Sequence, residues 1–200
     1  MEEQRYIEMT LDYYEQNANT FHNSTVGIDM SDMYECFLSR IPEGSSILDA
    51  GCGSGRDSKA FTDLGYNVSA FDASEQMVLR ARRLTGLDIQ VRQFEQMDEN
   101  GVYDGVWCCA SLLHVPLVEM LPVMRRVARS LKKNGAWFLS FKYGQGEREK
   151  DGRHFTDMNK ERLTTLASKL EYISIVNIWL TQDKRPERED LWLNAILLRH

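Results

Sequence analysis

Residues 47–56 read Ile-Leu-Asp-Ala-Gly-Cys-Gly-Ser-Gly-Arg. The apolar run 46–50 stops at three alternating glycines, a pattern that predicts a buried strand, a tight turn and then a helix over 57–64. Glycine permits a positive φ and has no Cβ, so the backbone of such a turn can approach a ligand closely. In open α/β sheets, ligands bind outside the carboxyl ends of the strands. The stretch therefore predicts a cofactor-binding turn in an α/β domain.

The spacing of the glycines separates two classes of cofactor. Dinucleotide-binding turns follow G-x-G-x-x-G, in which the third glycine lets the following helix pack closely. Gly51 and Gly53 fit that frame, but its third position is Arg56, and the pattern present is G-x-G-x-G. A nicotinamide dehydrogenase is therefore disfavoured.

Asp72 supports a nucleotide-like cofactor. It ends the second predicted strand, about 20 residues beyond the glycines, where an acid can accept hydrogen bonds from both ribose hydroxyls. The alternative is that Asp72 caps the next helix, but Ser74 fills that position better. We therefore expect Asp72 to bind a ribose.

Outside this turn, helical and strand patterns alternate along the chain. The predicted helices are 3–16, 29–41, 57–64, 74–84, one that begins near Pro122, and 159–169. The predicted strands are 46–50, 67–71, 88–92, 103–109, 136–141, 172–180 and 191–198. The last two strands have no helix between them, so they should pair antiparallel. The sequence predicts an α/β fold with a seven-stranded, mostly parallel sheet, helices on both faces and a C-terminal antiparallel hairpin.

The composition indicates one soluble domain. The chain has 200 residues, 42% of them hydrophobic and 27% charged, with no apolar run long enough to cross a bilayer. The N-terminus lacks the pattern of a secretory signal, so the cytoplasm is the expected location. The formal charge of −6 speaks mildly against a nucleic-acid substrate. We expect a single domain over 1–200, with an N-terminal helical cap over 1–42 and the core over 43–200.

The four cysteines and four histidines show no metal-binding spacing. We expect no metal site, and all four cysteines to be small, buried and reduced. Cys108 and Cys109 are adjacent, so their side chains should point to opposite faces of a strand.

The strand that ends in Asp49, the three glycines and the following helix resemble the first motif of class I, Rossmann-like methyltransferases that use S-adenosylmethionine. Segments 105–115 and 131–135 resemble the fourth-strand motif and the turn before the fifth strand, and 13–18 resembles an N-terminal cap that closes over the cofactor. The resemblance covers most of the chain and implies a small stand-alone enzyme of bacterial type. The implied cofactor is S-adenosylmethionine, with S-adenosylhomocysteine as the product.

The resemblance also implies the cofactor-binding residues. They are Tyr14, Asp49, Gly51, Cys52, Gly53, Gly55, Arg56, Asp72, Ala73, Met77, Gln93, Phe94 and Ala110. Gln93 stands where many family members have an acid near the adenine. Phe94 either lies against the purine or is simply a core residue. For Cys52 we expect main-chain contact only.

The implied reaction is an in-line displacement at the sulfonium methyl group. A base is needed only if the acceptor is protonated at neutral pH. His114 is the best candidate for that base, and the alternative is a histidine that bonds to the backbone at a helix entry. Residues 109–112 lack the Asn/Asp-Pro-Pro-Tyr-type motif of certain nitrogen methyltransferases, and a Pro-Cys pair for base-carbon methylation is also missing.

Residues 142–155 are predicted to form a long polar loop at the substrate side. Tyr143 and His154 are candidates for contact with the methyl acceptor. Arg148 or Arg153 could bind a carboxylate or phosphate through two parallel hydrogen bonds. The alternative is a solvated, mobile loop.

The favoured function is methyl transfer to a small molecule with an oxygen, nitrogen, sulfur or metalloid acceptor atom. Two alternatives remain open. One is methylation of RNA, such as a modified tRNA base, and the other is a non-catalytic domain that binds S-adenosylmethionine for a partner. We expect no membrane association.

Overall fold

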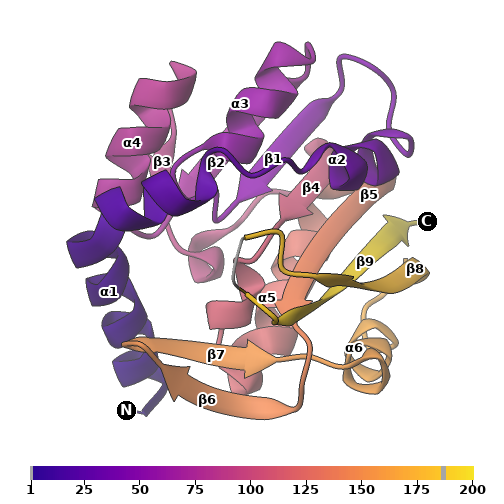
Figure 1. Cartoon of the computed structure of the whole chain (residues 1–200). Helices are drawn as coiled ribbons and strands as arrows, with labels where there is room; N and C mark the ends of the chain where they lie inside the picture. Colours follow the sequence, from indigo (N-terminus) through magenta and orange to yellow (C-terminus); the bar gives the residue numbers. More distant parts are fainter. Residues whose placement is uncertain (1, 186–187) are drawn as a thin grey trace.

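The structure, a computed structural model, describes residues 2–185 and 188–200. Seven strands form one sheet in the order β3-β2-β1-β4-β5-β9-β8 (Figure 1). They are β1 Ser46–Ala50, β2 Asn67–Asp72, β3 Gln90–Val91, β4 Tyr103–Cys108, β5 Leu131–Lys142, β8 Ile173–Gln182 and β9 Leu191–Arg199. Neighbours from β3 to β5 pair in parallel, and β9 runs antiparallel to both β5 and β8. The predicted α/β fold with a C-terminal antiparallel hairpin is confirmed.

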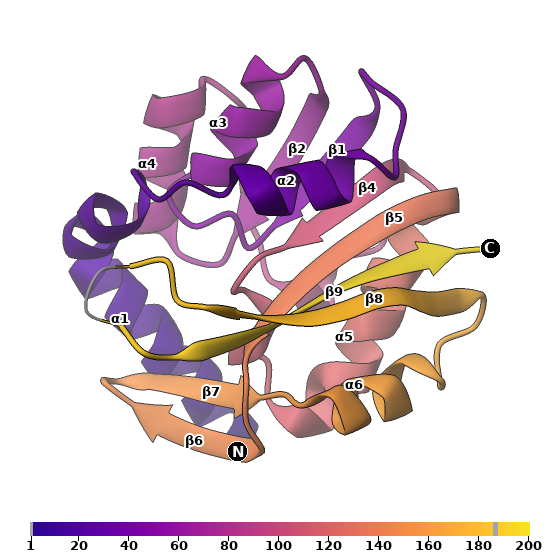
Figure 2. The same cartoon turned by 45° about the vertical axis from the view of Figure 1, so that its right-hand side comes forward.

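Helices cover both faces of this sheet. They are α1 Glu2–Thr25, α2 Ser31–Leu38, α3 Arg56–Asp63, α4 Glu75–Thr85, α5 Leu117–Ser130 and α6 Lys160–Ala167. Phe37 of α2 and Phe61 of α3 pack on Trp107 of β4 on one face, with α4 beside α3 (Figure 2). Met124 of α5 and Leu163 of α6 belong to the apolar cluster on the other face. Among the described residues, no helix is long and apolar enough to cross a membrane.

The two helices of the predicted N-terminal cap occupy different places. α1 is longer than the predicted 3–16 and contacts α4, so it passes over the carboxyl ends of the strands. By contrast, α2 is part of the core, because its Met33 and Phe37 are buried against the sheet.

The prediction that a helix begins near Pro122 is wrong. α5 begins at Leu117, Pro116 occupies its N-cap, and Pro122 lies inside the helix. Proline lacks the N–H that would bond the carbonyl four residues earlier. That residue is Val118, which lies on the exposed face of the helix.

The predicted loop 142–155 is largely a β-hairpin, which corrects that expectation. Strands β6 Gly146–Lys150 and β7 Arg153–Asp157 pair antiparallel as a separate two-stranded sheet. Asp151 and Gly152 join them with φ values of 52° and 73°. Two consecutive positive φ angles match the strand twist of a tight two-residue hairpin, and Asp-Gly is a favoured pair for that turn. The hairpin packs against α1 (Figure 1).

The expectation that all four cysteines are buried is wrong for Cys36, which is exposed on the outer side of α2. Cys108 is fully buried, while Cys52 and Cys109 are half-buried, and all four are free. Cys108 joins the cluster under α5 and Cys109 packs against the opposite cluster, so the predicted division between the two faces of β4 is confirmed.

Candidate cofactor and acceptor site

The glycine turn lies between β1 and α3, and two of its glycines are needed for close packing. A Cβ on Gly51 would lie 2.4 Å from Cβ of Ser111, in the segment after β4. A Cβ on Gly55 would lie 2.9 Å from the backbone of Ala81 in α4. Both glycines also have φ angles in the left-handed region, 75° and 88°. The turn can therefore sit against its neighbours only with glycine at these positions.

A cavity of about 300 Å³ opens beside this turn. Its wall includes the carboxyl ends of β1, β2 and β4, α1 above them, and the hairpin of β6 and β7. Fourteen of the predicted site residues line it, namely Tyr14, Gly51, Cys52, Gly53, Arg56, Asp72, Ala73, Met77, Gln93, Phe94, Ala110, His114, Arg148 and Arg153. The four that do not are Asp49, Gly55, Tyr143 and His154. The structure thus brings most of the predicted site together in one hollow.

Asp72 lies at the end of β2 and fixes the position of the glycine turn. Its Oδ2 accepts a hydrogen bond from the backbone N–H of Gly53 (2.8 Å), and its Oδ1 accepts one from Ser74 (2.9 Å). Burial raises the pKa of Asp72, and these N–H groups oppose the shift. Ser74 itself caps α4 through Met77, as expected. The carboxylate therefore faces the cavity from a fixed position.

Phe94 combines the two roles between which the sequence did not decide. It belongs to the core cluster and packs edge-on against Phe71 at 5.3 Å between ring centroids. It also lines the cavity, beside Gln93. An apolar ring and an amide at one wall provide the surface and the polar groups that a purine would need.

Asp49 lies behind the cavity rather than on its wall. It is 2% exposed, and its Oδ2 accepts a hydrogen bond from Oγ of Ser58 (2.6 Å). Burial, followed by the nearby charge of Asp57, raises the pKa of Asp49. Asp49 therefore links the end of β1 to α3, the helix that follows the glycine turn.

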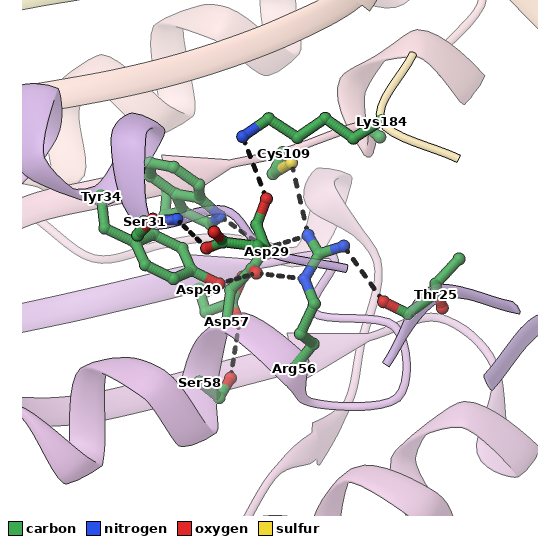
Figure 3. Close-up of polar contacts among 12 residues, drawn as sticks. Thr25, Asp29, Ser31, Tyr34, Asp49, Arg56, Asp57, Ser58, Cys109 and Lys184 are labelled. Atoms are coloured by element: carbon green, nitrogen blue, oxygen red, sulfur yellow. Dashed lines mark hydrogen bonds and ion pairs between the residues drawn. The ribbon is translucent and has the colours of Figure 1, made fainter. Parts of the chain in front are cut away.

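A buried polar cluster beneath the turn was missed by the sequence analysis (Figure 3). Asp57 accepts hydrogen bonds from Nε and Nη2 of Arg56 (2.6 and 2.9 Å), from the hydroxyl of Tyr34 (2.5 Å) and from Nε1 of Trp107 (2.8 Å). Burial alone would raise the pKa of Asp57, but the guanidinium and these donors outweigh it and lower the pKa. The cluster joins α2, α3 and β4, which the sequence separates too widely for a local pattern to show.

Arg56 also reaches from this cluster into the cavity. Its Nη1 donates to the carbonyl of Thr25 at the end of α1 (3.4 Å), and its Nη2 lies 3.8 Å from Sγ of Cys109. The residue that disfavoured a dinucleotide turn thus connects α1 to the glycine turn.

His114 is held on the cavity wall by two hydrogen bonds. Its Nδ1 lies 2.7 Å from the carbonyl of His154, so Nδ1 carries the proton, and the free Nε2 accepts from the hydroxyl of Tyr14 at 2.9 Å. Burial lowers the pKa of His114 to about 3 and raises that of Tyr14 to about 12. Both groups are therefore neutral at pH 7, and the backbone bond foreseen as the alternative role is present.

We predict that His114 does not titrate between about pH 5 and 8, unlike an unperturbed imidazole with a pKa of about 6.5. The folded-state pKa of His114 lies below its unfolded value. The contribution of the neutral imidazole to the free energy of unfolding is therefore fully present above about pH 6.5 and is lost as the pH falls toward 3. NMR of the His114 ring protons over this range is the measurement. A titration midpoint near 6.5 would show instead that the ring is solvated.

Two predicted acceptor contacts are corrected by the hairpin. His154 is 1% exposed, stacks on Tyr6 at 4.3 Å and lies outside the cavity. Neighbouring residues of a strand point to opposite faces, so Arg153 and Phe155 line the cavity while His154 between them does not. Tyr143 precedes the hairpin, bridges to Met158 and is 41% exposed.

The end of the cavity away from the glycine turn is rich in ion pairs. Lys142 contacts carboxylate oxygens of Asp183 (3.2 Å) and Asp190 (2.7 Å), both from the segment between β8 and β9. Arg148 forms a two-bond pair with Asp157, at 2.6 and 3.1 Å. Among residues 2–185 and 188–200, no group of three or more His, Cys, Asp or Glu side chains could hold a metal ion.

The strand order reverses between β1 and β4, and the cavity opens at that point, where open α/β sheets bind nucleotide-like ligands. The fold and site therefore define a Rossmann-like α/β protein with a cofactor pocket at its switch point.

Comparison with known proteins agrees with this class. Residues 47–135 match the family described as "Methyltransferase domain". The chain is 36% identical over 105 residues to a ubiquinone biosynthesis O-methyltransferase of Xanthomonas oryzae, over 48% of this chain and 43% of that protein. The chain thus spans less than half the length of that curated relative. Over this central segment the chain is therefore similar to methyltransferases.

Solved structures share the fold across nearly the whole chain. A 1,6-didemethyltoxoflavin-N1-methyltransferase of Burkholderia thailandensis, bound to S-adenosylhomocysteine, has a TM-score of 0.76 at 17% identity, covering 94% of this chain and 84% of its own. A magnesium protoporphyrin IX methyltransferase of Synechocystis, with bound S-adenosylmethionine, has a TM-score of 0.73 at 18% identity and covers 95% of both chains.

Proposed function

We propose that the protein transfers a methyl group from S-adenosylmethionine to a small-molecule acceptor. The observation that carries the proposal is a single cavity that joins the glycine turn and Asp72 at one end to a polar, hairpin-built wall at the other. The cofactor supplies an activated methyl group on its sulfonium. The protein's part is then to bind, align and enclose two reactants, and such alignment can lower a barrier by about 7–11 kcal/mol.

The residues on the wall suit this cofactor. The carboxylate of Asp72 offers acceptors for two ribose hydroxyls, while Gln93, Phe94 and Met77 offer an amide and apolar surface for the adenine. The turn around Gly51 and the cavity-facing edge of Arg56 would hold the amino-acid part, with Asp49 supporting the turn from behind.

Other residues would exclude water and orient the acceptor. α1 contributes Tyr14 to the wall and closes the cavity from above. The Tyr14 hydroxyl donates to His114, so its oxygen can still accept a hydrogen bond from an acceptor O–H or N–H. His114 would position the Tyr14 hydroxyl rather than remove a proton itself, since both of its ring nitrogens are already hydrogen-bonded.

A small-molecule acceptor is favoured over RNA. The matched relatives are named for small molecules, and the formal charge of −6 gives no broad attraction to phosphates. We also propose that residues 1–200 act as one domain in the cytoplasm, where four free cysteines stay reduced.

The test uses S-adenosylmethionine labelled on its methyl group. The protein is incubated with labelled cofactor and separate small-molecule, RNA and protein fractions of a cell extract, with the Asp72→Ala variant as the inactive control. We expect label in the small-molecule fraction with the wild type only. Label in RNA would support the nucleic-acid alternative, and cofactor binding without any transfer would support the non-catalytic one.

A further inference from the structure

The cations that line the acceptor end of the cavity differ in how well they are paired. Lys142 and Arg185 share Asp183, with Asp190 also on Lys142. The Arg148 guanidinium is paired with Asp157, and Lys184 with Asp32. Each of these charges already has a carboxylate within a normal hydrogen-bond distance, so an incoming anion would have to displace it.

Arg153 is the exception among the buried cations of this wall in the described part of the chain. Its side chain is only 13% exposed, and its Nε is buried with no hydrogen-bond partner. The nearest carboxylate oxygen, on Asp151, is 3.9 Å from Nη2 and belongs to a side chain that is 58% exposed. At that distance and exposure the pair is weak.

Aromatic rings surround this guanidinium instead of carboxylates. Its central carbon lies 4.2 Å from the ring centroid of Tyr13, 5.1 Å from that of Phe155 and 6.0 Å from that of Tyr14. Ring faces attract a cation but accept no strong hydrogen bonds. The Tyr14 hydroxyl also takes a side-chain hydrogen bond from Arg153, while the buried Nε–H remains without a partner.

A desolvated guanidinium with an unpartnered Nε–H favours one kind of ligand. A carboxylate or phosphate can accept two parallel N–H bonds from the planar fork and neutralise the buried charge. A neutral amide or ketone can accept a hydrogen bond but leaves the charge uncompensated.

We propose that Arg153 binds an oxyanion, a carboxylate or phosphate group, of the methyl acceptor, so that the acceptor is an anionic molecule. The proposal rests on the proposed function and specifies its substrate class. Arg153 lies on the same wall as Tyr14 and His114, so the bound oxyanion fixes the acceptor at the end of the cavity where those side chains meet.

The experiment measures binding of three probes that share one ring system: 2-naphthoate, 2-naphthyl phosphate and neutral 2-naphthamide. Each is titrated calorimetrically into the protein saturated with S-adenosylhomocysteine. The variants are wild type, Arg153→Gln, Arg153→Lys and Lys150→Gln. Lys150 is the matched control, because it pairs with Arg153 across the hairpin, lines the same cavity and is exposed.

We expect wild type and Lys150→Gln to bind at least one anionic probe about tenfold or more tightly than the amide. Arg153→Gln should lose this preference. Arg153→Lys should keep only part of it, because lysine lacks the planar guanidinium that donates two parallel N–H bonds. The preferred anion tells whether the natural group is a carboxylate or a phosphate.

The outcomes separate this inference from the proposed function. If S-adenosylhomocysteine binds but the anions have no advantage over the amide, or no probe binds, the acceptor inference is wrong and the cofactor assignment stands. The same conclusion follows if Arg153→Gln keeps the preference. If S-adenosylhomocysteine fails to bind the wild type, both are wrong.

Discussion

The Asp72→Ala variant is expected to bind S-adenosylhomocysteine about 100-fold more weakly than the wild type. The carboxylate holds the N–H groups of Gly53 and Ser74 at 2.8 and 2.9 Å and faces the cavity. Hydrogen bonds to a charged group contribute about 1.5–3 kcal/mol each, and about 2.7 kcal/mol corresponds to a 100-fold change in affinity. The change removes the two hydrogen bonds that hold the turn and the proposed acceptor for the ribose hydroxyls. Calorimetric titration measures the effect.

Asp88→Ala is the matched control for this variant. Asp88 precedes β3, and its side chain is 85% exposed with one long ion pair of 3.6 Å to Arg82. We expect its affinity for S-adenosylhomocysteine to equal that of the wild type. Unchanged binding by Asp72→Ala, with the protein folded, would remove Asp72 from the cofactor site.

The second large effect is expected for Asp57→Asn, which should lower the free energy of unfolding by about 3–5 kcal/mol. The change leaves the buried guanidinium of Arg56 without its counter-charge and puts amide hydrogens among the donors of Tyr34 and Trp107. For a chain of this size the melting temperature should fall by roughly 10 °C. Urea unfolding and thermal melts are the measurements.

The double variant Arg56→Met/Asp57→Asn separates the ion pair from general disruption. Replacing both members of a buried pair costs less than removing one of them. We therefore expect the double variant to recover part of the lost stability. A double variant that is no more stable than Asp57→Asn would show that an unpaired Arg56 is not the cause.

The same cluster predicts a pH dependence. The folded-state pKa of Asp57 is lowered, so its contribution is present above the unfolded pKa of about 3.9 and is lost as the pH falls below it. Asp57→Asn should remove that part of the acid-induced loss of stability.

Local sequence rules were sufficient to predict that the glycine turn and Asp72 lie together on one cavity wall. The short apolar strand, the alternating glycines and Asp72 occupy neighbouring strand ends, and parallel strands bring those ends together at one edge. Arg56 argued against a dinucleotide-binding turn for an equally local reason, because it occupies the position of the third glycine in G-x-G-x-x-G. These features depend on spacing within one strand-turn-helix unit, which a single sequence displays.

The hairpin shows a signal that was present but not used. Asp151-Gly152 is a favoured pair for a two-residue hairpin turn, and it marks strands on both sides. With the strands recognised, their alternation would have separated Arg153 and Phe155 from His154. Treating 142–155 as a loop made all four candidate side chains equivalent.

Other contacts could not be predicted because they join distant segments. Lys142 meets Asp183 and Asp190 only because β9 inserts beside β5. The partners of Asp57 come from α2 and β4, and nothing local marks Tyr34 or Trp107 as polar partners rather than core aromatics.

The measurement that tests the account most directly is a calorimetric titration of the wild-type protein with S-adenosylhomocysteine and, separately, with NAD. The account predicts micromolar binding of S-adenosylhomocysteine at one site and no binding of NAD. No binding of S-adenosylhomocysteine, or tighter binding of NAD, would contradict the interpretation of the glycine turn and the function proposed from it.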